Sequence, residues 1–136
     1  MKIKKSDAAY LAGMLDGEGY LGLTRVGKSY KSRVVIANCN LPLLKHIQGI
    51  IGGYICKKTH YNKNACTGYI LTVLRLKDWL PQIIPYMVGK GNKATLLIEA
   101  LSLLDKRKKR TNMAGNDHLE RLKEIDILLR KKEWEI

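Results

Sequence analysis

Acidic residues are missing from a long central part of this chain. Between Gly19 and Lys77 the sequence has no Asp or Glu, although the same stretch carries ten Lys and Arg residues. The whole 136-residue chain has a formal net charge of +13. A basic surface without nearby acids attracts phosphates, and we therefore expect a nucleic-acid partner. The alternative is a solvated basic face that keeps the protein soluble.

Long apolar runs and a cysteine framework are also lacking. No apolar run approaches the ~20 residues of a membrane-spanning helix, and no segment resembles a signal peptide. An odd number of cysteines, three, argues against a disulfide framework and favours a reducing compartment. Cys56, His60 and Cys66 match no standard zinc-finger spacing and lack an obvious fourth ligand. We therefore expect one intracellular domain over residues 1–136, large enough for a core of its own.

The first half of the chain predicts a helix, a β-hairpin and a second helix. The first helix is expected over residues 8–17, with Ser6 or Asp7 as its cap. Apolar and polar residues then alternate on both sides of a turn at residues 27–29, which is typical of a two-stranded hairpin. The second helix is expected over residues 40–53, where its apolar stripe ends at two glycines.

The second half predicts another hairpin followed by helices. The hairpin is expected over residues 54–76, and a short helix runs from Asp78 to Pro85. An apolar helix over Lys93–Leu104, a charged connector at residues 105–110 and an amphipathic surface helix over Asp117–Lys132 complete the chain. This order favours an α+β fold in which helices cover one face of an antiparallel sheet.

Two acids stand among glycines at the end of the first expected helix. In the sequence LAGMLDGEG, residues 11–19, these acids are Asp16 and Glu18. A carboxylate near the carboxyl end of a helix faces the negative end of the macrodipole, at a cost of about 0.3–1 kcal/mol. Two acids at this end of a helix are unfavourable for the helix itself, so their presence in a basic protein needs another explanation.

Small residues recur along one ridge of the same helix. Ala9, Gly13 and Gly17 are spaced at four-residue intervals. Small side chains in one row let a second helix approach closely. We expect this ridge to be a dimer interface; the alternative is packing inside its own subunit.

The motif at residues 11–19 resembles that of the LAGLIDADG homing endonucleases. The chain length, the order of elements and the acid-free sheet agree with family members that carry one motif, over a core at residues 6–105 followed by a helical tail at 111–136. The resemblance implies an αββαββα saddle with a four-stranded sheet astride double-stranded DNA, and a homodimer. It also implies an intron-encoded nuclease that makes Mg²⁺-dependent double-strand breaks at a long pseudo-palindromic target.

The resemblance also implies a metal centre at the end of the motif. The metal-binding acid falls on Glu18, where many members have Asp, and the carbonyl of Gly17 is the matching backbone ligand. Two Glu18 side chains would meet at the two-fold axis and share Mg²⁺ with substrate phosphates. Asp16 is interpreted as a support at the helix end.

Two further catalytic residues are implied by the resemblance. The family has a polar residue after the second strand, which falls on Asn38, and a basic residue after the third helix, which falls on Lys90. Asn38 is expected to order water near the metals, and Lys90 to support that water or to stabilise the transition-state charge. Lys93 is a weaker match than Lys90, and Asn38 could instead simply begin a turn.

The basic sheet is expected to read DNA, because a two-stranded ribbon fits the major groove. The candidate base contacts are Tyr20, Thr24, Lys28, Lys31, Arg33, Lys58, Thr72 and Arg75. Lys57 and Lys63 are expected to contact phosphates, which position the protein without specifying a sequence.

Two non-nuclease functions remain open at the level of sequence. The same surface would suit an RNA maturase that assists intron splicing, or a DNA-binding derivative that does not cut. The intact acids of the motif and Lys90 favour cleavage, since a protein that only binds has no use for them. An endonuclease of this kind is expected in the cytoplasm of a prokaryote or in the organelle that encodes it.

Overall fold

The computed structural model describes residues 1–58, 67–109 and 116–136. The helices are α1 (Lys5–Glu18), α2 (Leu41–Ile51), α3 (Leu76–Ile83), α4 (Gly91–Lys109) and α5 (Asn116–Arg130), with short 3₁₀ turns η1 (Ile84–Tyr86) and η2 (Glu133–Glu135). The strands are β1 (Gly19–Val26), β2 (Ser29–Asn38), β3 (Tyr54–Lys58) and β4 (Gly68–Val73). The order of helices and hairpins is the one that apolar periodicity predicts.

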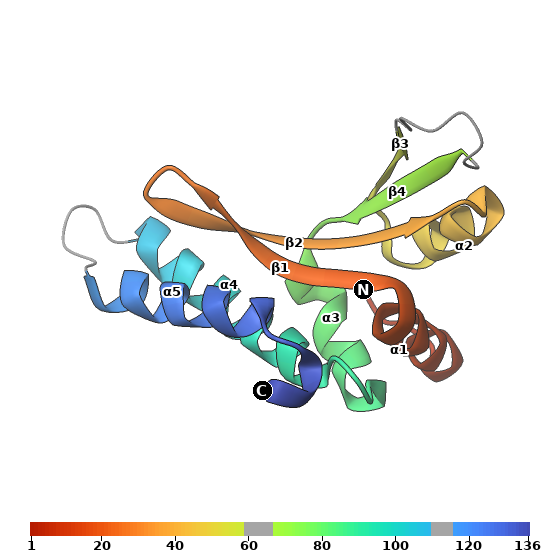
Figure 1. Cartoon of the computed structure of the whole chain (residues 1–136). Coiled ribbons are helices and arrows are strands. Elements are labelled where there is room, and N and C mark those ends of the chain that lie inside the picture. Colours follow the sequence, from red (N-terminus) through yellow and green to blue (C-terminus); the bar gives the residue numbers. More distant parts are fainter. Residues whose placement is uncertain (59–66, 110–115) are drawn as a thin grey trace.

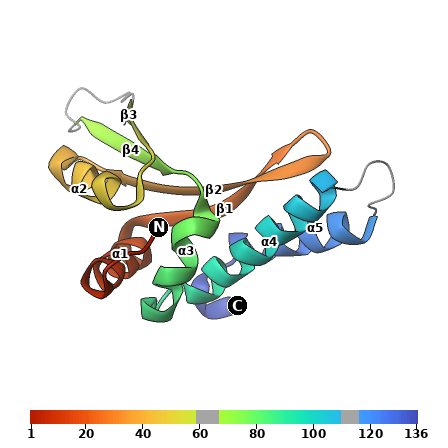
Figure 2. The same cartoon turned by 180° about the vertical axis from the view of Figure 1, so that it is seen from behind.

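The four strands form one antiparallel sheet in the order β1-β2-β4-β3. Gly19 pairs with Ile36, Ile36 pairs with Leu71, and Leu71 pairs with Ile55, so these four positions form one row across the sheet. Figures 1 and 2 show the helices beneath the sheet, while none of the described helices covers the opposite face. We call this uncovered side the outer face. The expected α+β fold, with helices on one face of a four-stranded antiparallel sheet, is confirmed.

The core lies between the sheet and the helices. Alternate strand residues such as Leu21, Val34 and Leu71 point inward and are buried. Trp79 of α3 is fully buried among them and donates its indole N–H to the carbonyl of Leu74 at 3.0 Å. Each fully buried side chain of this kind contributes roughly 1.5–3 kcal/mol, so the helix-covered face fixes the register of the sheet.

Two local details differ from the expectation. α1 begins at Lys5 with Lys4 as its N-cap, and no side chain caps it, so Ser6 and Asp7 lie inside the first turn. α4 continues to Lys109, through residues 105–109 that were expected to form a connector. Lys and Arg have high helix propensity, and Leu101 and Leu104 still pack against the core, so the helix has no reason to end at its apolar part.

The last helix packs as its pattern predicts. Leu122, Ile125 and Leu129 of α5 are buried. Arg121 joins α5 to α4, since its Nε and Nη2 donate to the two carboxylate oxygens of Glu99 at 2.7 and 3.0 Å. This pair of parallel bonds fixes the register between the two helices.

The cysteines do not follow the expectation from their number. Cys39 is disulfide-bonded, whereas Cys56 is free and exposed. An odd count excludes full pairing but does not exclude a single bridge. Across the described ranges, no helix combines the length and apolarity needed to cross a membrane.

Candidate functional site

The end of α1 and the start of β1 form a sharp junction. The backbone becomes extended at Gly19, with φ −83° and ψ 145°. A Cβ atom at Gly19 would lie 2.8 Å from both the Cα and the carbonyl oxygen of Leu15, so only glycine fits there. The turn leaves Glu18 exposed at the carboxyl end of the helix, and no described residue forms a hydrogen bond or an ion pair with its carboxylate.

The neighbouring acid, Asp16, is fully engaged with the loop between η1 and α4. Its Oδ2 accepts a hydrogen bond from the backbone N–H of Val88, and its Oδ1 accepts one from Lys90, both at 2.8 Å. Burial raises the pKa of Asp16, but the N–H groups of Val88, Lys90 and Gly89, with the Lys90 ammonium, outweigh burial and lower the pKa below its usual 3.8. Asp16 therefore joins the helix end to this loop, as a structural support does.

The loop held by Asp16 carries Lys90 to the α1–β1 junction. The Nζ of Lys90 donates to the carbonyl oxygen of Gly19 at 2.6 Å, although the two residues are 71 positions apart. The Lys90 ammonium thus lies one residue along the backbone from Glu18. Lys93, the weaker match, lies in the first turn of α4.

Asn38 is the last residue of β2, at the end of the sheet where β1 begins. Because Ile36 pairs with Gly19, Asn38 lies two residues further along β2, beside the carboxyl end of α1. Its Oδ1 accepts the backbone N–H of Asn40 at 2.8 Å, and Asn40 in turn caps α2 by accepting from Leu43 at 3.1 Å. Asn38 therefore does begin a turn. Its amide NH₂ has no hydrogen-bond partner among the described residues.

The small-residue ridge of α1 is exposed in the part of the chain that the structure describes. Ala9, Gly13 and Gly17 are exposed, and a Cβ atom at either glycine would meet nothing within 4 Å. The buried residues of α1 are Ala8, Leu11, Ala12 and Leu15. Among the described residues, the ridge is therefore not packed inside its own subunit.

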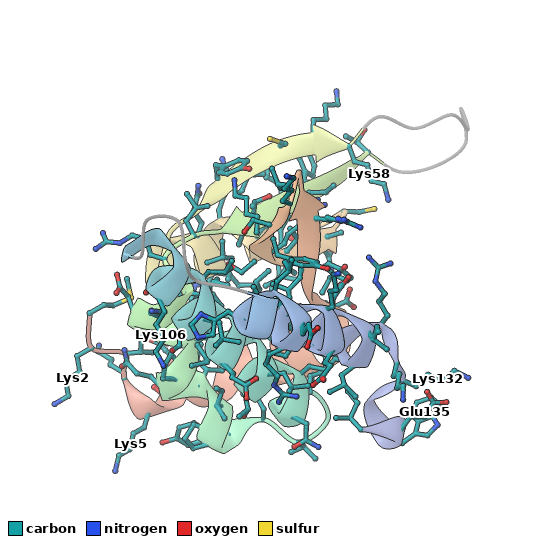
Figure 3. All side chains as sticks on the ribbon, turned by 90° about the vertical axis from the view of Figure 1, so that its left-hand side faces the viewer. Lys2, Lys5, Lys58, Lys106, Lys132 and Glu135 are labelled. Carbon is teal, nitrogen blue, oxygen red and sulfur yellow. The ribbon has the colours of Figure 1, made fainter. Side chains whose placement is uncertain are left out.

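Six of the candidate DNA contacts share the outer face of the sheet. Strand alternation and the pairing register place them there. They are Tyr20, Thr24, Lys31, Arg33, Lys58 and Thr72. In Figure 3, Lys58 extends at the far end of the sheet, away from Lys2 and Lys5 on the helical side.

The remaining four candidates lie elsewhere. Lys28 lies in the β1–β2 turn, and Lys57 alternates to the helix-covered side of edge strand β3, although it is exposed. Arg75 follows β4 rather than belonging to it, has a left-handed backbone with φ 56°, and places its Nε 2.9 Å from a carboxylate oxygen of Asp78. Arg75 is thus outside the sheet surface. Lys63 lies outside the described residues.

The comparisons with known proteins identify the fold. No family model and no curated protein sequence matches this chain. Among solved structures, the archaeal intron-encoded homing endonuclease I-Vdi141I complexed with DNA superimposes with a TM-score of 0.73 at 19% identity, over 91% of this chain and 82% of that one. The homing endonuclease I-CvuI in complex with its target gives 0.65 at 19% identity, over 95% and 87% of the two chains. The I-SmaMI LAGLIDADG homing endonuclease bound to cleaved DNA gives 0.67 at 16% identity, over 96% and 45%.

The chain has the fold of the LAGLIDADG homing endonucleases. Residues 11–19, whose sequence resembles the name-giving motif, form the second half of α1 and its junction with β1. In this LAGLIDADG fold the motif contributes the exposed ridge, the exposed Glu18 and the Gly19 carbonyl that binds the Lys90 ammonium, at the end of the sheet where β1 begins.

The oxygen donors at the motif suit a hard divalent cation but do not complete a site. Mg²⁺ prefers carboxylate, carbonyl and water oxygens. Glu18 and the last carbonyls of α1, including that of Gly17, are such donors, whereas both oxygens of Asp16 are already engaged. Within the described ranges no three His, Cys, Asp or Glu residues form a group that could hold a metal. The donor set fits part of a divalent-cation site.

Sequence reasoning missed two features of the site. Tyr54 lies on the outer face, 49% exposed and paired with Thr72, and the alternation of strand β3 could have indicated it. The backbone N–H groups of Val88 and Lys90, which bind Asp16, lie more than 70 residues away from it in sequence, so no local pattern indicates them.

Proposed function

We propose that this chain is a homodimeric, Mg²⁺-dependent homing endonuclease that makes double-strand breaks in DNA at a long pseudo-palindromic target. The observation that carries the proposal is the exposed ridge of α1, which ends at an exposed Glu18 beside Lys90, in a chain whose uncovered sheet face carries Lys31, Arg33 and Lys58. None of these features indicates a nuclease by itself. Together they give the parts of a nuclease that needs a second copy.

The dimer follows from the ridge. Ala9, Gly13 and Gly17 are exposed in the single chain, and two such ridges can approach to the distance of closely packed helices. Two α1 helices that meet on a two-fold axis bring two copies of Glu18 together. The chain covers only 45% of I-SmaMI, so about two copies match the length of that protein.

The DNA-binding surface is the outer face. Lys31, Arg33 and Lys58 lie on it, and the sequence from Gly19 to Lys77 contains no acid that could balance them. In the dimer the two sheets continue each other along the duplex. A two-fold protein reads a pseudo-palindromic site, because each subunit meets one half-site.

The chemistry of the proposed site is phosphodiester hydrolysis. Glu18 and the Gly17 carbonyl of each subunit would hold Mg²⁺, which when bound polarises a phosphoryl oxygen and lowers the pKa of bound water. The Lys90 ammonium lies beside the junction, where it stabilises negative charge that develops on the phosphate. The free amide NH₂ of Asn38 donates to water at the same edge. No covalent intermediate with the protein is needed.

Selection of cleaved sites tests this function. The purified chain is incubated with a random duplex library in Mg²⁺, and products cut in both strands are sequenced. We expect one long, nearly palindromic consensus, no cutting in EDTA, and the same consensus from a matched control variant, Glu120→Gln, which changes an exposed acid of α5. Binding without cutting would favour a non-cleaving derivative, and binding of intron RNA but not duplex DNA would favour a maturase. We also propose that the protein acts inside the cell, in the compartment that holds its target DNA.

A further inference from the structure

A hollow in the outer face lies where β4 separates from β2. The last pair between these strands is Val34 with Val73, so β2 continues alone alongside β1 through Arg33 and Lys31. The resulting hollow has a volume of about 240 Å³. Its outer-face lining residues are Thr24, Lys31, Arg33, Tyr54 and Thr72.

The cations of this hollow are available to a ligand. Neither the side chain of Lys31 nor that of Arg33 forms a hydrogen bond or an ion pair with any residue in the described ranges, and no acid lines the hollow. Lys31 also borders a larger hollow, of about 400 Å³, on the other side of the β2 edge. Asp78 and Asp105 line that second hollow and pair with its cations, Arg75 and Lys77, so it does not attract an electron-rich ligand in the same way.

The part of the outer face nearer to α1 has a different chemistry. Tyr20 pairs with Val35, and Val35 pairs with Thr72, so a neutral row lies next to the basic hollow. The next row toward the α1 junction pairs Ala37 with Ile70 and Ile70 with Cys56. The rows of the outer face between the α1 junction and Arg33 are thus neutral or apolar, whereas the cations of that face are Arg33 and Lys31 at the hollow and Lys58 at the other end of the sheet.

The two regions of the outer face suit different bases in the major groove. Arg and Lys bind the O6 and N7 acceptors of guanine in the major groove, whereas apolar side chains contact the methyl group of thymine. Alternate strand residues are about 6.8 Å apart, and base pairs are stacked about 3.4 Å apart, so Arg33 and Lys31 are about two base pairs apart along a groove that follows β2.

We propose that the hollow is a guanine-reading site, in which Arg33 and Lys31 each recognise a G·C pair, about two base pairs apart, in the outer part of each half-site. The neutral rows between the hollow and the two-fold axis meet base pairs for which guanine is not favoured. This inference rests on the proposed function and adds the composition of the target.

The test separates this inference from the endonuclease proposal. Duplexes from a random library are selected for binding in Ca²⁺ and sequenced, with the wild-type chain and with Arg33→Ala, Arg33→Lys and Lys31→Ala. We expect two guanine preferences per half-site about two base pairs apart, of about 5- to 150-fold each, as is usual for a bidentate contact. Arg33→Ala should remove one preference and Lys31→Ala the other. Arg33→Lys should keep overall affinity but weaken the preference, because it keeps the charge and loses the planar fork.

Lys123→Ala is the matched control, since it removes an exposed cation of α5, which lies on the helical side of the sheet. It should leave both guanine preferences unchanged. Two results would overturn the inference: a wild-type consensus without this pair of guanines, or guanine preferences that persist in the Arg33 and Lys31 variants. If the wild-type chain still cuts DNA in Mg²⁺, the endonuclease proposal is unaffected by either result. Failure of the wild-type chain to bind any duplex would overturn both.

Discussion

The contact between Asp16 and the loop before α4 gives a prediction for which a magnitude can be worked out. Asp16→Asn keeps the shape of the side chain and one carbonyl oxygen, so one of the two N–H groups of Val88 and Lys90 keeps an acceptor and the other faces an NH₂ group. A hydrogen bond to a charged group contributes about 1.5–3 kcal/mol. The bond from Val88 is exposed, so we expect the lower end, about 1.5 kcal/mol of unfolding free energy.

The loss of unfolding free energy in Asp16→Asn depends on pH, and the lowered pKa of Asp16 sets the direction of that dependence. The pKa of Asp16 is lowered in the folded protein, so its carboxylate contributes stability above the ordinary value of 3.8 and loses that contribution as the pH falls through the lower, folded value. The difference in stability between wild type and Asp16→Asn should therefore be fully present at pH 7 and disappear in acid below pH 3.8.

Thermal unfolding without metal, measured from pH 7 down to pH 2, checks this prediction. A change of 1 kcal/mol moves the midpoint of a chain of this size by about 3–6 °C, so Asp16→Asn should melt roughly 5–9 °C lower at pH 7. Asp7→Asn, an acid in the first turn of the same helix, is the matched control and should cost about 0.3–1 kcal/mol through the helix dipole alone. Equal melting temperatures of wild type and Asp16→Asn at pH 7 would refute the structural role of Asp16. Cutting should fall less in Asp16→Asn than in a variant of Glu18.

Three further predictions concern the dimer, the DNA and Lys90. Gly13→Leu should give a folded monomer of 15.4 kDa that does not cut, because a Cβ atom at this position meets no described residue within 4 Å, whereas the added side chain would fill the space between two helices; light scattering that still shows a dimer would contradict this. DNA affinity, measured by gel shift, should fall by about 10³–10⁵ between 50 and 200 mM salt if 6–10 phosphates are contacted, and a flat response would argue against the basic face as the DNA surface. Lys90→Met should retain DNA binding and lower the cutting rate by about 10²–10³, as loss of one donor to a developing charge does, whereas an unchanged rate would leave Lys90 with its structural bond to Gly19 only.

The sheet and its exposed face could be predicted from the sequence because one face is buried. Leu21, Leu23, Val34 and Ile36 alternate with exposed residues, and a shift of one residue would expose all four, so the pattern fixes both strands. The same pattern placed Arg75 on the sheet, because Leu74, Arg75 and Leu76 still alternate. The left-handed backbone at Arg75 ends the strand, and alternation does not indicate it.

The candidate site could be predicted only in part. The motif marks Glu18 and Gly17, because small residues and an acid at a helix end are a local pattern. The functions of Asp16 and of the Lys90 side chain depend on hydrogen bonds between segments more than 70 residues apart, which the packing of α3 and η1 against α1 brings together. Local patterns describe each element, and the contacts between elements assemble the site.

The central claim is that Glu18 acts in cleavage and not in binding or folding. The most direct measurement compares Glu18→Gln with the wild-type chain for cutting in Mg²⁺ and for binding of the same duplex in Ca²⁺. We predict that cutting falls by several orders of magnitude while binding is retained, because the exposed carboxylate is lost and the outer face is unchanged. The melting temperature should hold or rise, since a negative charge at a helix carboxyl end is removed. Normal cutting by Glu18→Gln would contradict the proposed metal site, and loss of binding together with cutting would show that Glu18 is a structural acid.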